Sequence, residues 1–263
     1  MSLMRAAELP FFDARFLAFA HRGGAAYGPN VGRENSRYAF EQAVALGYRY
    51  LETDVHATAD KTLLAFHDAR LDRVTGRAGT LAQMTAAQVA EVRVGGIDPI
   101  PTFAELLQAF PVARFNVDAK ADHAVDLLAD VIAEHEAYDR VCVGSFSPAR
   151  LHRLRRRLGP RVASAVTSRG VALHRFAPWL TRVLNSPAQA LQLPVSARVL
   201  GRTTTILTPS LLRAAHRAGK QVHVWTVDDL PTMERLLDLG VDGIFTDRID
   251  TLKTVLEARD LWS

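Results

Sequence analysis

The sequence predicts an α/β fold, a (β/α)₈ TIM barrel with a small insertion after the second strand. Short apolar runs alternate with helical segments along the chain, which is the pattern of a parallel sheet. About eight such strand–helix units in ~250 residues match the usual count and length of this barrel. We therefore expect residues 1–263 to form one barrel domain.

Eight short apolar runs are the expected barrel strands, because polar or turn residues bound each of them. In chain order they are Leu17–His21, Tyr50–Val55, Arg114–Val117, Val141–Ser145, Ala163–Val166, Ala190–Pro194, Gln221–Thr226 and Gly243–Thr246. An open, doubly wound sheet is the alternative, but no Gly-x-Gly-x-x-Gly motif follows the first run. The barrel is therefore favoured.

Helices are expected between these strands. The segment Ser36–Leu46 has Asn35 or Ser36 as its cap and Gly47 as its stop. Further helices, each followed by Pro or Gly, are Thr102–Phe110, Ser210–Ala218 and Thr232–Leu239. The basic run Arg150–Arg157 has leucines at core spacing, so we interpret it as the solvated face of a helix rather than a site for nucleic acid or membrane phosphates.

Residues 57–100 do not fit the strand–helix repeat. They contain the strand-like run Thr62–Phe66, an irregular polar stretch and a short helix near Ala86–Val92. We interpret this segment as an excursion after the second strand.

The composition is that of an ordinary globular protein, with 48% hydrophobic and 23% charged residues. The single cysteine, Cys142, excludes an internal disulfide and a cysteine-based metal site. No apolar run approaches the ~20 residues of a membrane span, and the first residues lack a signal-peptide pattern. We therefore expect a cytoplasmic protein without stable membrane insertion. Nothing in the sequence indicates the number of subunits.

Residues suited to phosphate chemistry lie at the ends of apolar runs. His21, Arg22 and two glycines end the first expected strand, and His67-Asp68 lies in the excursion. Histidine moves protons near neutral pH, and arginine binds phosphate through a planar set of donors. Cleavage of a phosphodiester needs this combination.

Carboxylates share one side of the second expected strand. Side chains alternate along a strand, so Glu52 and Asp54 point to the same side. Crowded carboxylates repel one another unless a cation lies between them, and a hard divalent cation prefers such oxygen ligands. A solvated strand face is the alternative. We place His56 on the opposite face of this strand, packed behind the site.

The third expected strand repeats the arrangement, because Asn116, Asp118 and Lys120 share one face. Two strands that both present carboxylates in this way are difficult to explain as surface decoration. The repetition favours a site over a solvated strand face.

The chain resembles the glycerophosphodiester phosphodiesterase family in nine motifs that occur in the family's order. They are His21-Arg22-Gly23, Glu34-Asn35-Ser36, Glu52-x-Asp54-Val55, Thr58-x-Asp60, His67-Asp68 with Leu71-Asp72-Arg73-x-Thr75, Asn116-x-Asp118-x-Lys120, Ser145-Phe146, Trp225-Thr226-Val227-Asp228 and Asp242-Gly243-Ile244-x-Thr246-Asp247. Each motif is weak alone, but their shared order is specific. The resemblance also identifies residues 57–100 as the family insertion, which carries the second histidine over the barrel mouth.

The resemblance implies hydrolysis of glycerophosphodiesters to glycerol 3-phosphate and an alcohol, within glycerol and lipid metabolism. It makes His21 and His67 the general acid and base, without deciding which is which. It implies one divalent cation, Ca²⁺ or Mg²⁺, held by Glu52, Asp54 and Asp118. The implied substrate-binding residues are Arg22, Glu34, Lys120, Ser145, Phe146 and Trp225.

Three residues depart from the family pattern. Asp118 stands where the family usually has glutamate, so its shorter side chain reaches the metal directly, binds through water or shifts the ion preference. Arg33 replaces a proline before the first glutamate and leaves the loop less rigid or adds charge near the substrate. Lys61 replaces a glycine at a turn position that favours positive φ.

Two rival functions remain open. One is a lysophospholipase D-like phosphodiesterase, in which the apolar residues of Phe176–Leu180, within the pocket loops 169–185, contact an acyl chain; these residues could equally pack a helix. The other is a non-catalytic phosphate-binding barrel, supported only by Asp118 and opposed by the two histidines. We expect a small glycerophosphodiester as substrate and no nucleic-acid partner.

Overall fold

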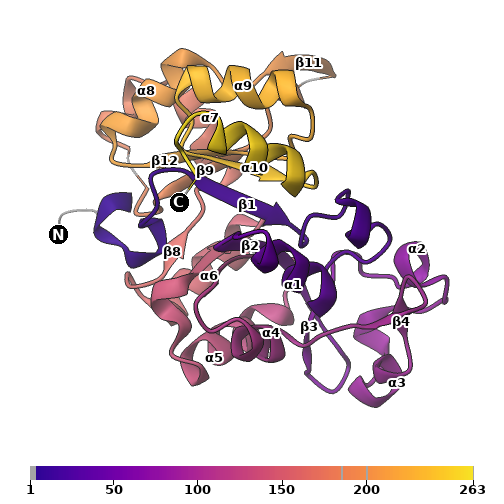
Figure 1. Ribbon diagram of the computed structural model, residues 1–263. Coiled ribbons are helices and arrows are strands. Elements are labelled where there is room, and N and C mark those ends of the chain that lie inside the picture. The colour runs from indigo at the N-terminus through magenta and orange to yellow at the C-terminus, as the bar shows by residue number, and fades with distance from the viewer. Residues whose placement is uncertain (1–3, 185, 200, 263) are drawn as a thin grey trace.

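Eight parallel strands form the centre of the molecule (Figure 1). The computed structural model describes residues 4–184, 186–199 and 201–262, so Asn185, the last residue of the pocket loops considered above, lies outside the described part. The strands are β1 (Leu17–His21), β2 (Tyr50–Ala57), β6 (Arg114–Ala119), β7 (Val141–Gly144), β8 (Ala163–Ser164), β9 (Ala190–Leu193), β12 (Gln221–Val224) and β13 (Gly243–Thr246). Each run predicted as a strand therefore contains one.

These strands follow the order β8-β7-β6-β2-β1-β13-β12-β9, and all neighbours are parallel. A parallel bridge between Ala165 and Ala190 joins the two outer strands. The sheet thus closes on itself, which confirms the predicted barrel over the open sheet.

One helix packs outside the barrel for each strand. These helices are α1 (Arg37–Ala45), α4 (Phe103–Ala109), α5 (Ala124–Glu134), α6 (Pro148–Leu158), α7 (Ser168–Phe176), α8 (Pro209–Arg217), α9 (Leu230–Leu239) and α10 (Ile249–Glu257). The Ser36 hydroxyl caps α1 by accepting the N–H of Ala39, as its sequence position predicts. None of the helices in the described ranges is both long and apolar enough to cross a membrane.

An N-terminal plug fills the end of the barrel away from the strand C-termini. It consists of η1 (Ala6–Glu8) and η2 (Pro10–Phe12), and Phe11 and Phe12 pack with Phe19 in one apolar cluster. His223 lies 5.1 Å from the Phe19 ring and is fully buried, which lowers the pKa of its imidazole to about 4. It is therefore a neutral core residue.

The inserted segment 57–100 packs beside the barrel with a small core of its own (Figure 1). It contains β3 (Leu63–Ala65), which pairs antiparallel with β2, then α2 (Asp72–Thr75), η4 (Leu81–Gln83), α3 (Ala86–Ala90), β4 (Arg93–Val94) and β5 (Asp98–Pro99). Arg33 clamps the segment to the loop after β1, because its guanidinium donates two hydrogen bonds of 2.5 and 2.6 Å to Asp98. The charge of Arg33 thus binds the insertion, not the substrate. Lys61 has φ +66°, as its turn position predicts.

A second excursion follows β9. The strands β10 (Ser196–Val199) and β11 (Arg202–Thr205) form an antiparallel hairpin that projects from the barrel before α8 (Figure 1). The sequence analysis did not predict this hairpin.

Candidate active site

A sharp turn after β1 begins the site. Arg22, Gly23 and Gly24 all have positive φ, of 50°, 86° and 88°. A Cβ atom at Gly23 would lie 2.7 Å from the Cβ of Ala39, so only glycine fits there. The turn directs the backbone N–H of Arg22 to Oε2 of Glu52, at 3.1 Å.

His21 projects from the end of β1 into the site. Its Nδ1 donates to Oδ1 of Asp247 at 2.8 Å, and its Nε2 lies 3.8 Å from Oε2 of Glu52. Burial alone would lower the pKa of His21, but the charges of Glu52 and Asp247 outweigh burial and raise it. The aspartate therefore orients the ring and leaves Nε2 directed toward the cavity.

His67 has the same arrangement on the inserted segment. Its Nδ1 lies 2.6 Å from Oδ1 of Asp68, and Nε of Arg73 donates to the other oxygen of Asp68 at 2.6 Å. Arg73 also donates two hydrogen bonds of 2.7 Å to Glu34. A chain of charged groups thus links the second histidine to the loop after β1.

Glu34 lies behind Arg22, outside the cavity wall that the described residues form. It accepts a 3.1 Å hydrogen bond from Nη1 of Arg22 in addition to those from Arg73. Burial alone would raise the pKa of Glu34, but Arg73 and Arg22 outweigh burial and lower it. In this structure Glu34 acts on the site through two arginines.

The carboxylates of β2 and β6 meet at one side of the cavity. The register pairs Asp54 with Asp118, and Lys120 Nζ lies 2.8 Å from an oxygen of each. Burial would lower the pKa of Lys120, but these two charges outweigh burial and raise it. Burial, followed by the charge of Asp54, raises the pKa of Glu52. The shared strand faces predicted from alternation are thus present.

The donor chemistry of this cluster fits a hard cation, although the ligands do not enclose one. Within the described residues, no group of three His, Cys, Asp or Glu side chains is arranged to hold a metal ion. Asp54 Oδ2 and Asp118 Oδ1 are nevertheless buried and accept no hydrogen bond from any described residue. Unsatisfied carboxylate oxygens of this kind favour a divalent cation. Lys120 supplies the positive charge between these two carboxylates.

The position of His56 corrects the sequence analysis. Side chains two residues apart lie on the same side of a strand, so His56 follows Asp54 on β2 instead of facing away from it. Its Nε2 donates to the backbone carbonyl of His67 at 3.1 Å. His56 therefore supports the backbone that carries the second histidine.

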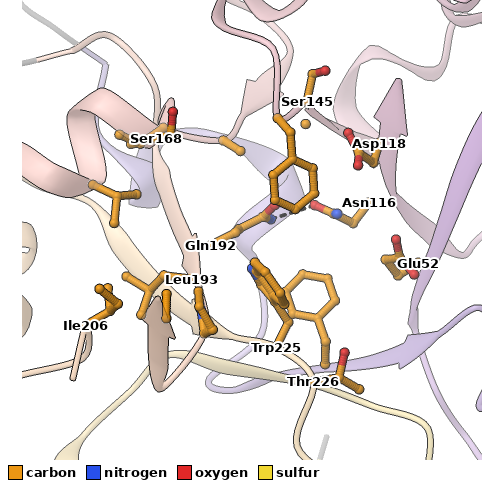
Figure 2. Close-up of a pocket in the computed structure, with 18 of the residues that line it drawn as sticks. Glu52, Asn116, Asp118, Ser145, Ser168, Gln192, Leu193, Ile206, Trp225 and Thr226 are labelled. Carbon is orange, nitrogen blue, oxygen red and sulfur yellow. Dashed lines mark hydrogen bonds between the residues drawn. The ribbon is translucent and has the colours of Figure 1, made fainter. Parts of the chain in front are cut away.

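A cavity of about 460 Å³ joins these groups at the C-terminal ends of the strands. Figure 2 shows Glu52, Asn116 and Asp118 on one side and Leu193 and Ile206 on the other. The cavity therefore has a polar wall, which carries both histidines, and an apolar wall. Other residues of the apolar side are Ala165, Val166, Val171, Ala172, Phe176, Pro194 and Ala197.

Three expected substrate-binding residues line the same cavity. The Ser145 hydroxyl donates to the Ala119 carbonyl at 2.8 Å. The rings of Phe146 and Trp225 meet edge to face, with centroids 5.8 Å apart, and the Phe146 ring lies 5.5 Å from Lys120 Nζ. These residues lie between the polar and the apolar wall.

Sequence reasoning missed two polar residues of the site. Asp247 was quoted only as part of the last motif, and its partner His21 lies 226 positions earlier. Gln192 lies in the cavity, where its amide donates to Oδ1 of Asn116 at 2.6 Å (Figure 2). Gln192 faces the barrel interior from β9, and a polar residue in this otherwise apolar run was the available signal.

Comparison with known proteins agrees with this geometry. A closed (β/α)₈ barrel that brings two carboxylate-anchored histidines and cationic side chains into one cavity has the architecture of an enzyme and the groups that acid–base cleavage of a phosphate ester requires. Residues 21–251 match the model of the glycerophosphoryl diester phosphodiesterase family. The chain therefore belongs to this family and is a phosphoric diester hydrolase.

Individual relatives cover nearly the whole chain. A protein of Mycobacterium tuberculosis named probable glycerophosphodiester phosphodiesterase 2 is 41% identical over 94% of this chain and 92% of its own length. The glycerophosphodiester phosphodiesterase of Caldanaerobacter subterraneus is 27% identical over 90% of this chain and 96% of its own length.

Solved structures share the fold. A phosphodiesterase of Oleispira antarctica, in complex with the product sn-glycerol-3-phosphate, superimposes with a TM-score of 0.76 at 20% identity, covering 91% of this chain and 96% of its own. A protein of Silicibacter pomeroyi described as a glycerophosphoryl diester phosphodiesterase gives a TM-score of 0.78 at 22% identity, covering 97% and 100%.

Proposed function

We propose that this chain hydrolyses glycerophosphodiesters to glycerol 3-phosphate and an alcohol, with His21 and His67 as the acid–base pair. One observation carries the proposal. Each histidine is anchored through Nδ1 by an aspartate, and both line the cavity that Arg22 and Lys120 also line. Two oriented imidazoles are what cleavage of a phosphodiester with proton transfer at both oxygens requires.

The proton movements follow from this arrangement. One imidazole takes the proton of the attacking oxygen as its bond to phosphorus forms. The other imidazole donates its proton to the leaving oxygen as the second phosphorus–oxygen bond breaks. The attacking oxygen belongs to water or to the neighbouring hydroxyl of the substrate. In the second case a cyclic phosphate forms first, so product analysis at short times distinguishes the two routes.

Arg22 and Lys120 are the proposed phosphate ligands. Both side chains are cationic and half-buried, and both contact Asp54. Charge builds on the phosphoryl oxygens in the transition state, and fixed cations in a water-poor site stabilise it. Ser145, Phe146 and Trp225 would contact the remainder of the substrate.

We further propose that Glu52, Asp54 and Asp118 bind one divalent cation, Ca²⁺ or Mg²⁺, with Lys120 displaced toward the substrate. Asp54 Oδ2 and Asp118 Oδ1, which accept no hydrogen bond from the described residues, support this proposal. When bound, the cation would polarise a phosphoryl oxygen of the substrate.

Calorimetric titration with each ion tests the metal site without relying on activity. We expect Asp54→Asn to lose binding and Asp118→Glu to bind as tightly or more tightly, because the longer side chain reaches further. Full activity after exhaustive chelation, or unchanged binding by Asp54→Asn, would contradict the site.

The central test of the function is turnover of glycerophosphocholine, coupled to detection of glycerol 3-phosphate, in metal-supplemented buffer. Release of glycerol 3-phosphate supports the proposal. Binding of the substrate without release would instead favour the non-catalytic barrel.

We also propose that residues 1–263 act as one domain, since both ends of the described chain pack on the barrel. The Ala6 N–H donates to the Gly219 carbonyl, and the Trp262 ring packs on Tyr48 at 4.9 Å. The cytoplasmic location stays a prediction.

A further inference from the structure

Charge is divided unevenly along the chain. No Asp or Glu occurs between Asp139 and Asp228, whereas 15 Lys and Arg residues do. This acid-free stretch extends from β7 to β12 and includes α7 and the β10–β11 hairpin. The rest of the chain therefore carries all 28 acidic residues. The net charge of the whole chain is only +4 because acidic residues elsewhere offset one strongly basic half of the barrel.

The basic half also exposes an apolar segment, which we call the apolar rim. It consists of Phe176, Trp179, Leu180, Val183 and Leu184, with exposed fractions from 39% to 82%. Monomeric proteins seldom leave several large apolar side chains exposed within nine consecutive residues unless they meet a partner.

The apolar rim continues into the cavity. Phe176 belongs to both, because it lines the cavity and is half exposed. Ala172 lies one turn before Phe176 on α7 and also lines the cavity, and the exposed Arg169 lies about one turn before Ala172 on the same helix face. A ligand on the rim would thus reach the apolar wall of the site without crossing polar surface.

Cationic side chains flank the rim. Arg175 lies 4.9 Å from the Phe176 ring, and its Nε donates to the Thr205 carbonyl, so α7 and the hairpin are joined. Arg198 and Arg202 are exposed on that hairpin. Within the described ranges, neither these arginines nor Arg169 forms an ion pair with a carboxylate, which agrees with the lack of acidic residues in this half.

We propose that the apolar rim and its flanking arginines dock the enzyme on an anionic phospholipid surface, with the cavity mouth toward the lipid. The combination of exposed Trp, Phe and Leu with unpaired arginines is what peripheral binding to such a surface requires. Trp179 suits the headgroup region because its ring is apolar and its N–H is polar. The docking is peripheral and involves no membrane-spanning segment.

Binding to vesicles tests this proposal independently of the proposed hydrolysis. The full chain is mixed with vesicles of phosphatidylcholine alone and of phosphatidylcholine with phosphatidylglycerol, and bound protein is measured by sedimentation. We expect binding to the anionic vesicles, a blue shift of tryptophan emission, and loss of binding as salt screens the arginines. Equal binding to neutral vesicles, or none to either, would overturn the proposal.

Paired variants locate the surface. Trp179→Ala should weaken vesicle binding roughly tenfold, because a buried aromatic ring is lost. Arg169→Glu should weaken it by at least about fivefold, the effect of one cation near an anionic surface. The matched controls are Val112→Ser, 82% exposed in the turn before β6, and Arg156→Glu on α6 in the same acid-free stretch. Both controls should bind as the parent chain does.

Two measurements exclude other causes. Turnover of soluble glycerophosphocholine should be unchanged in Trp179→Ala, since its side chain is outside the cavity wall that the described residues form. Sedimentation equilibrium without lipid should show the same mass for parent and variant. A dimer that Trp179→Ala dissociates would assign the rim to a second copy of the chain and overturn lipid docking.

Discussion

The two histidines of the site are held in place by different kinds of interaction. His21 ends a barrel strand whose neighbours on both sides are paired in register, so the closed sheet fixes its position. His67 follows β3, which pairs with β2 on one side only, and ion pairs of Arg73 and Arg33 tie its inserted segment to the loop after β1. Buried hydrogen bonds do not depend on salt, whereas partly exposed ion pairs do. One histidine of the proposed acid–base pair is therefore fixed by the closed barrel, whereas the position of the other depends in part on salt-sensitive ion pairs.

The largest expected effect comes from removing either imidazole. His21→Ala and His67→Ala should each lower kcat by about 10²- to 10⁴-fold, the usual contribution of a general acid or base. Unfolding curves should stay close to the parent's. His152→Ala, which changes an exposed histidine on α6, is the matched control and should keep full activity. Near-normal kcat in a folded His21 or His67 variant would remove that residue from the chemistry.

Removing the aspartates that orient the rings should have a smaller effect. Asp247→Asn and Asp68→Asn preserve the side-chain shape but weaken the hydrogen bond to Nδ1 of each histidine. We expect kcat to fall by about 10- to 100-fold, which is the usual effect of removing a carboxylate that orients a metal-bound histidine. The comparison predicts the larger loss for Asp68→Asn, because Asp68 also binds Arg73 and so holds the insertion. The predicted difference would be contradicted if the two variants lost the same activity as each other, both at low and at high salt.

The clamp between Arg33 and Asp98 should matter less for the chemistry. Arg33→Ala leaves the nearly buried Asp98 carboxylate without its partner, which should lower the free energy of unfolding by about 1–3 kcal/mol. We expect kcat to fall a few-fold and proteolysis within residues 57–100 to accelerate. Arg37→Ala, which removes an exposed pair with Glu41, should change neither.

Acid should destabilise the inserted segment 57–100 before it destabilises the barrel. The pKa values of Glu34 and Asp68 are lowered in the folded chain, because Arg73 outweighs the opposing effect of burial at both. The stability they contribute is complete above the unfolded pKa of glutamate, 4.5, and is lost as pH falls through the lowered folded values. Hydrogen exchange between pH 6 and about pH 3 should therefore show the insertion losing protection first. Simultaneous loss in β1 and β2 would refute this order.

The sequence was most informative where regular periods apply. Alternation placed Glu52 and Asp54 on one side of β2, and the register then set Asp54 beside Asp118. The same rule, applied consistently, would have placed His56 correctly too. Capping residues likewise located the start of α1.

The sequence was least informative where contacts join distant segments. The hairpin β10–β11 consists of two strands of four residues each; apolar alternation extends over Ala197 and Val199 of β10 only, and β11 is polar throughout, so the pattern is too short to mark a hairpin. Asp247 reaches His21 only because β1 and β13 are neighbours in the closed barrel. The pairing of Arg33 with Asp98 depends on how the inserted segment packs.

The sequence by itself determined the strand–helix repeat and the faces of β2 and β6, because these follow from local periods, and its family resemblance pointed to His21 and His67. Only the tertiary structure decided that the sheet closes and that the two histidines share one cavity. It also decided that Lys120 lies between two carboxylates and that an apolar rim remains exposed. Such features arise from packing between segments far apart in the chain, which no local pattern encodes.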